Sequence, residues 1–320
     1  MPSFHLTLKS VSRGRGRSAT AAAAYRAAAR LACAREGRVH NYTRRRGLVA
    51  AVVLAPPDAP AWAADRERLW NAAEAAERRR DAAVARDWEL ALPHELEDEA
   101  RVRIALTFAE VLVRRFRVAA DCTVHRPRPK GDERNHFAHV LTTTRVVGPE
   151  GLGRKTRELD VRWSARPEIL HLRALLARLQ NDALAAAEAE RGVPLGRVDH
   201  RPLAARRAAA LARGDRDEAE LLDRPAERKL GWVASRIERR ARLEAAAEGR
   251  PYEPATRRGA FTREAREARG GLAEAQAEVR AARAGARPLE EDQRLGRPAT
   301  GRRRGAWGGP PPKGGPGTTR

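Results

Sequence analysis

The segment from His125 to His139 constrains the fold of this chain more than any other stretch of its sequence. Apolar and polar residues alternate from position 118 to 124, and a second apolar run from 137 to 141 follows a loop rich in Arg and Pro. Both runs predict β-strands. A loop of about ten residues is too short for a crossover helix, so the two strands must pair antiparallel. The sequence therefore predicts a sheet that is at least partly antiparallel.

Three of the eight histidines lie in this segment, at His125, His136 and His139. Antiparallel pairing brings His125 and His139 close together, and neutral imidazole is the commonest metal ligand in proteins. Side chains alternate between the two faces of a strand, so residues 137 and 139 share one face and His136 points to the other. A plainer interpretation stays open, in which the histidines only bond water or backbone at the strand ends.

The remaining pattern predicts strands over 4–11, 47–55 and 88–93 and helices over 19–35, 61–86 and 98–117. With the two histidine-bearing strands they make a two-layer α/β sandwich with about five, largely antiparallel strands. We expect helices on one face of the sheet, and the other face free for metal and DNA. In the strand over 88–93, Glu89 then lies opposite the apolar residues Trp88, Leu90 and Leu92.

Composition changes along the chain predict three parts. A linker rich in Gly and Arg over 148–160 precedes a helix with a leucine stripe that ends near 191. Residues 241–300 are rich in Ala, Arg and Glu, which is typical of a charged helical extension. Residues 301–320 are Gly, Pro and Arg and predict a disordered basic tail.

The charge of the chain indicates a nucleic-acid partner. Lys and Arg number 64 against 42 acidic residues, for a net charge of +22, which favours contacts to phosphate. Only five of the basic residues are lysine, a bias that a GC-rich gene also produces. The basic residues predicted to contact DNA are Arg13, Arg15, Arg17, Arg26, Arg44, Arg45, Arg126, Arg128, Lys130, Arg134 and Arg145. For each of them, a solvated basic loop is the alternative.

The two cysteines give no motif. Cys33 and Cys122 are isolated, without a CxxC pair or a disulfide framework. The N-terminal strand pattern is unlike a signal peptide, and the longest apolar run, near 48–56, is too short to span a bilayer. We therefore expect a cytoplasmic protein with no membrane insertion.

Tyr25 is one of three tyrosines and follows an alanine-rich segment that begins at Ser18. Alanine is the best helix former and serine is a good N-cap, so this segment predicts a helix. Its small neighbours leave the Tyr25 hydroxyl accessible. For a helical tyrosine, packing of the ring against a sheet is the common alternative.

Several ordered motifs resemble one known family. They are residues 4–9 leading to Ser-Arg-Gly-Arg-Gly-Arg-Ser18 and Ala-Ala-Ala-Tyr25-Arg, the strand over 88–93, His125, the segment 135–139 with 142–145, and residues 198–201. Over about the first 240 residues the chain resembles the MobA/MobL relaxases of plasmid mobilisation, which are His-hydrophobic-His single-strand endonucleases with a palm-like fold.

The resemblance implies an activity and a site. Tyr25 would be the nucleophile that nicks one DNA strand at an origin of transfer, leaving a 5′-phosphotyrosyl bond that is later rejoined. His125 and His139 would hold a divalent ion, Mg²⁺ or Mn²⁺, and Glu89 would orient a histidine or take a proton. Single-stranded DNA is the implied substrate, with relaxosome auxiliary proteins and a type IV coupling protein as partners.

One motif departs from the family pattern, which reads Asn-X-His-X-His. Phe137 stands at the middle histidine, and a histidine appears one residue earlier, at His136. His136 would serve as third ligand only if a bulge or the loop end redirected it. Otherwise Glu89 or Glu133 would have to contribute a carboxylate, or the two histidines would bind metal weakly. Besides an active relaxase, the sequence therefore allows a catalytically impaired origin-binding protein or a non-specific basic DNA-binding protein.

Overall fold

The computed structural model describes residues 4–127, 132–226 and 230–285. It divides the chain into two compact units between Arg201 and Pro202, earlier than the domain limit expected near residue 240. The predicted tail over 301–320 lies outside the described residues. In the part of the chain that the structure describes, no helix is long and apolar enough to cross a bilayer.

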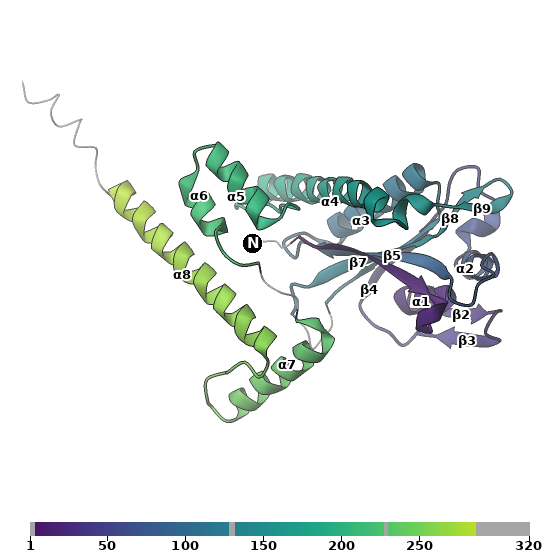
Figure 1. Cartoon of the computed structure of the whole chain (residues 1–320), viewed down its shortest axis with the longest axis horizontal. Coiled ribbons are helices and arrows are strands. Elements are labelled where there is room, and N and C mark those ends of the chain that lie inside the picture. Colours follow the sequence, from purple (N-terminus) through teal and green to yellow (C-terminus); the bar gives the residue numbers. More distant parts are fainter. Residues whose placement is uncertain (1–3, 128–131, 227–229, 286–320) are drawn as a thin grey trace, which may run out of the picture. The chain divides into compact units, whose positions relative to one another are not determined.

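A five-stranded sheet forms the centre of the first unit (Figure 1). Its strand order is β1-β5-β7-β6-β4, and all four strand pairs are antiparallel. The strands are β1 (Leu6–Ser12), β4 (Leu48–Leu54), β5 (Ala83–Leu92), β6 (Ala120–His125) and β7 (His136–Thr143). This confirms the predicted α/β class with an antiparallel sheet.

Two helices cover one face of this sheet, α3 (Asp98–Phe116) and α4 (Arg162–Arg191). Acidic residues occupy the first turn of α3, where their negative charge interacts favourably with the helix dipole. An apolar stripe follows at helical spacing. From the sheet, Trp88, Leu90 and Val140 pack into the same core as Phe108 of α3. These even-numbered strand residues are buried as predicted, which leaves the odd-numbered ones to the other face.

The other face is not free over its whole length. Helices α1 (Ala19–Arg26) and α2 (Arg66–Ala75) pack there around a second core that contains Trp70, Val84 and Leu141. Trp70 Nε1 donates to the buried carboxylate of Asp121 on β6. The predicted open face is therefore restricted to the end of the sheet where β6 finishes and β7 begins.

Both helices on this face are shorter than predicted. The first ends at Arg26, because the chain turns at Ala28 with a φ of 50° and then forms the hairpin β2 (Arg30–Cys33) and β3 (Arg38–Asn41). The second is preceded by a short 3-10 turn and ends at Ala75, and strand β5 already begins at Ala83. β5 is bonded to strands on both sides and is mostly buried, so its first half lacks the alternation that marks a half-exposed strand.

The expected linker over 148–160 is also structured. It contains most of the hairpin β8 (Arg145–Gly148) and β9 (Gly151–Lys155), followed by a short 3-10 turn. The second unit contains the helices α5 (Leu203–Ala212), α6 (Arg216–Leu222), α7 (Gly231–Ala247) and α8 (Arg257–Gly285). Within it, the carboxylate of Glu238 on α7 accepts from the backbone and hydroxyl of Thr256, just before α8.

Candidate active site on the open face of the sheet

Three rings from β6 and β7 form the centre of the candidate site. The regular register places His125 opposite Phe137 and Thr123 opposite His139. The ring centroids of His125 and His139 are 6.0 Å apart, and Phe137 stacks on His125 with a centroid distance of 5.1 Å. The predicted pairing of His125 and His139 is present, and Phe137 shares their face.

A buried carboxylate orients His139. Asp87 Oδ1 lies 2.9 Å from His139 Nδ1, and Arg26 Nη2 donates to the other oxygen of Asp87. Burial opposes ionisation of Asp87, but the hydrogen bond from His139 and the charge of Arg26 outweigh it and lower the pKa of Asp87 from 3.8 to about 2. Because Nδ1 faces a carboxylate, the imidazole presents Nε2 to a ligand, as metal-bound histidines commonly do.

The second imidazole is held from its own strand. His125 is buried, and its Nε2 lies 3.2 Å from Thr123 Oγ1, on the side where His139 stands. With metal–nitrogen bonds of about 2.1 Å, two rings that share one ion have centroids within about 6.5 Å of each other. The centroid distance of 6.0 Å lies within this limit. Among the described residues, no third His, Cys, Asp or Glu joins the pair in a three-ligand group.

The structure does not bring His136 to this pair. Strand β7 runs without a bulge from His136 to Thr143 against β5, so the side chain of His136 points to the α3 side of the sheet. There burial and the charge of Arg101 lower its pKa. Of the carboxylates considered as replacements, Glu133 lies in an exposed turn before β7.

Glu89 lies on the predicted face, directly opposite His139 in the register. Its carboxylate forms an ion pair with Lys9 of β1. Asp87, the other acidic residue on this face of β5, contacts His139 directly. Sequence reasoning missed Asp87, although it has the same strand parity as Glu89 and is a diagonal neighbour of His139.

Tyr25 lies on the last turn of α1 and is 38% exposed. Ser18 caps this helix as predicted, by accepting from the backbone N–H of Ala21, and buried Glu74 accepts from Ala19 N. The guanidinium carbon of Arg45 lies 4.0 Å from the centroid of the Tyr25 ring. The rings of Tyr42 and Tyr25 form a T-shaped pair with a centroid distance of 5.2 Å. The neighbouring Arg26 bonds Asp87, which in turn contacts His139. This Arg26–Asp87–His139 frame links the helix of Tyr25 to the histidine pair.

Several of the predicted DNA-contacting arginines are held in ion pairs. Arg13 and Arg145 bind the acidic residues Glu74 and Glu77 of the α2 end, Arg126 binds Asp98, and Arg134 binds Asp132. The side chains of Arg15, Arg17 and Arg44 are exposed, and they form no ion pair or hydrogen bond with the residues that the structure describes. Arg128 and Lys130 lie outside the described residues.

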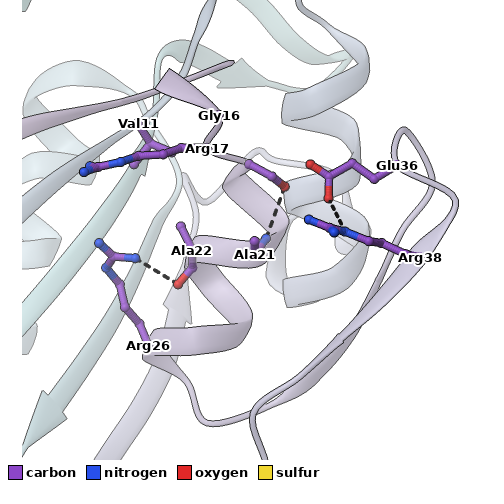
Figure 2. A pocket seen from close by; sticks show the side chains of 9 residues that line it. Val11, Gly16, Arg17, Ala21, Ala22, Arg26, Glu36 and Arg38 are labelled. Atoms are coloured by element: carbon purple, nitrogen blue, oxygen red, sulfur yellow. Dashed lines mark hydrogen bonds and ion pairs between the residues drawn. The ribbon is translucent and has the colours of Figure 1, made fainter. Parts of the chain in front are cut away.

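A pocket of about 360 Å³ opens beside the start of α1. It is lined by Arg17, Arg26 and Arg38 together with Ser18 and Glu36 (Figure 2). Figure 2 shows Arg26 bonded to the carbonyl of Ala22 and Arg38 paired with Glu36. Sequence reasoning missed Arg38, because it expected a helix to extend nearly to this position.

Comparison with known proteins decides the family. The model of the MobA/MobL family matches residues 17–214, which include Tyr25, Asp87, His125 and His139. The chain belongs to the MobA/MobL family. The family expected from the sequence motifs is thereby confirmed.

Other members and relatives of the MobA/MobL family match over different lengths. Mobilization protein MobL of Acidithiobacillus ferridurans is 36% identical over 300 residues, which cover 87% of this chain and 71% of that protein. Conjugal transfer protein TraA of Agrobacterium fabrum is 36% identical over 161 residues, or 47% of this chain and 14% of TraA. The chain therefore spans only a small part of TraA.

The fold is also similar to that of a solved structure. A chain described under "Molecular Basis of Vancomycin Resistance Transfer in Staphylococcus aureus" superposes with a TM-score of 0.53 and 27% identity. The match covers 62% of this MobA/MobL chain and 98% of the solved chain.

Proposed function

We propose that this protein is a plasmid-mobilisation relaxase that nicks one DNA strand at an origin of transfer through Tyr25 and later rejoins it. The observation that carries the proposal is the frame Arg26–Asp87–His139. It links the helix of the only exposed tyrosine in this unit to an imidazole pair on the open face of the sheet. The membership of the MobA/MobL family supports it.

In the proposed reaction the phenolic oxygen of Tyr25 attacks the scissile phosphorus. A bond forms between tyrosine and the 5′ phosphate, the P–O3′ bond breaks, and the departing 3′ oxygen takes a proton. The phosphotyrosyl bond conserves the energy of the phosphodiester, so the reverse attack by a 3′-hydroxyl rejoins the strand. Arg45 keeps the ring in place by stacking on it.

His125 and His139 are the residues that would hold a divalent ion, Mg²⁺ or Mn²⁺. Such an ion supplies charge stabilisation at the phosphate. Asp87 fixes the tautomer and direction of His139, and Thr123 fixes His125. Glu89, opposite His139, is the proposed proton acceptor, and its pairing with Lys9 keeps it on the open face.

Single-stranded DNA is the proposed substrate. The exposed residues Arg15, Arg17 and Arg44 flank the Tyr25 helix in the sequence and are the proposed phosphate contacts. Relaxosome auxiliary proteins and a type IV coupling protein are proposed partners, and the cytoplasm is the proposed location.

A second candidate function is origin binding without cleavage. It is favoured by Phe137, whose ring stacks on His125 where the family has a histidine. Two imidazoles then have to hold the ion without a third protein ligand, which weakens metal binding.

One experiment separates the two candidates. The full chain is incubated with Mg²⁺ or Mn²⁺ and a single-stranded oligonucleotide library, and protein-linked DNA is sought on a denaturing gel. We expect an adduct that Tyr25→Phe abolishes while DNA binding is retained. Tyr42→Phe is the matched control, since it removes a hydroxyl from the ring that touches Tyr25. Tight binding without an adduct in either metal would support the origin-binding candidate.

A further inference from the structure

The β2–β3 hairpin carries a second group of metal-binding side chains, apart from the histidine pair. Cys33, Glu36 and His40 each offer one ligand atom, and these atoms lie within 4.8 Å of one another. It is the one group of three such residues that the described part of the chain contains. No role in the proposed DNA chemistry accounts for it.

The local structure explains why these residues meet. His40 on β3 pairs with Leu31 on β2, and Cys33 follows Leu31 by two residues, so Cys33 and His40 share one face of the hairpin. Both side chains are buried, whereas the intervening Val39 is 45% exposed. The turn between the strands includes Gly37 at a φ of 60°, and it brings Glu36 back to 2.9 Å from His40 Nε2.

The donor set selects the kind of metal. A thiolate, an imidazole and a carboxylate suit Zn²⁺, whereas Mg²⁺ takes hard oxygen ligands and does not use sulfur. One thiolate and one carboxylate neutralise a divalent charge once Glu36 exchanges its ion pairs with Arg35 and Arg38 for the metal. Glu36 also lines the 360 Å³ pocket beside α1 (Figure 2).

The group touches the helix that carries Tyr25. Cys33 Sγ lies 3.8 Å from the hydroxyl of Ser18, the N-cap of α1. At the other end of the hairpin, β3 leads directly to Tyr42, whose ring packs on Tyr25. A metal that fixed the hairpin would therefore fix both ends of this helix.

We propose that Cys33, Glu36 and His40 form a structural zinc site that fastens the β2–β3 hairpin to α1. The site is separate from the His125/His139 pair, and the proposal does not depend on whether the protein cleaves DNA. Solvent supplies the fourth position of the ion.

The test uses the full chain, stripped with a chelator and kept reduced with a non-thiol reductant. Co²⁺ is added as a probe, because a Cys ligand gives a thiolate-to-cobalt charge-transfer band, and Zn²⁺ is then titrated against it. We expect one Zn²⁺ per chain to remove the band. In Glu36→Gln and His40→Gln the Zn²⁺ affinity should fall more than about 100-fold, since loss of residues that merely orient a ligand already costs about 10- to 100-fold.

Matched variants keep the result interpretable. Cys33→Ala removes the sulfur ligand and must abolish the band. Cys122→Ala removes the other buried cysteine, whose pKa burial raises to about 12, and must leave the band intact. Circular dichroism checks that each variant folds. The proposal is overturned if no charge-transfer band forms, if the band survives in Cys33→Ala, or if folded Glu36→Gln and His40→Gln bind Zn²⁺ as the parent does.

The histidine pair provides a further control. In the double variant His125→Ala/His139→Ala the cobalt band should persist unchanged. Its loss there would place the sulfur-containing site elsewhere and contradict the assignment.

Discussion

Replacement of Asp87 by asparagine tests the frame that joins Tyr25 to the histidine pair. The substitution keeps the shape of the side chain but removes the charge that faces His139 Nδ1 and Arg26. The pKa of Asp87 falls from 3.8 to about 2, so ionised Asp87 stabilises the folded state by about 2 kcal/mol at neutral pH. We expect Asp87→Asn to lower the free energy of unfolding by about that amount.

The same substitution should weaken metal binding. An orienting residue behind a metal-bound histidine is typically worth about 10- to 100-fold in affinity. We therefore expect Mn²⁺ binding by Asp87→Asn, measured by titration calorimetry, to weaken by that factor. Adduct formation should fall at low Mn²⁺ and recover when Mn²⁺ is raised.

Asp121→Asn is the matched control. Asp121 is equally buried on the same face of the sheet, and its carboxylate accepts hydrogen bonds from Arg66 and Trp70. Its loss should cost comparable stability and leave Mn²⁺ affinity unchanged. If both variants lose stability alike and both keep parental Mn²⁺ affinity and adduct formation, Asp87 only holds the fold and the reasoning fails.

Further outcomes follow from the same contacts. Since the folded-state pKa of Asp87 is depressed, its stabilisation is complete above about pH 4 and is lost as the pH falls towards 2; acid unfolding followed by circular dichroism should show a flatter limb over this range in Asp87→Asn. Phe137→His adds an imidazole to the face shared by His125 and His139, so Mn²⁺ affinity and adduct yield should both rise, and a fall in both would exclude this position as a ligand site. Arg15→Ala should weaken DNA binding and reduce the slope of affinity against salt by about one phosphate contact, with little change in thermal stability. Arg13→Ala should instead lower thermal stability with little change in DNA binding, because Arg13 is bonded to buried Glu74. Melting curves and salt-dependent binding isotherms distinguish the two variants.

Strand parity is what made part of the site predictable. Because side chains alternate along a strand, the sequence alone places Phe137 and His139 on one face and His136 on the other. That His125 shares the face of Phe137 and His139 follows from the register between β6 and β7. Asp87 was within reach of the same argument, since it precedes Glu89 by two residues on one strand. The strand predicted over 88–93 begins after Asp87, so the prediction considered Glu89 alone.

Other features depend on contacts that no local pattern contains. The first half of β5 is buried from both sides, so its residues lack the alternation that distinguishes a strand from the end of a helix. The end of α1 at Arg26 depends on the left-handed backbone of Ala28, a conformation that alanine rarely adopts. The grouping of Cys33 with His40 then follows from a hairpin that the expected helix concealed.

The connection between β6 and β7 can change in length without moving the imidazole pair. β6 ends at His125 and β7 begins at His136, and each strand is held in place by its own neighbours in the sheet. The length of the connection over 126–135 is therefore not set by the imidazole pair, and lengthening a loop is inexpensive, at about 0.6 kcal/mol per doubling. Insertions or deletions at this point of the chain should therefore leave the His125/His139 pair in place.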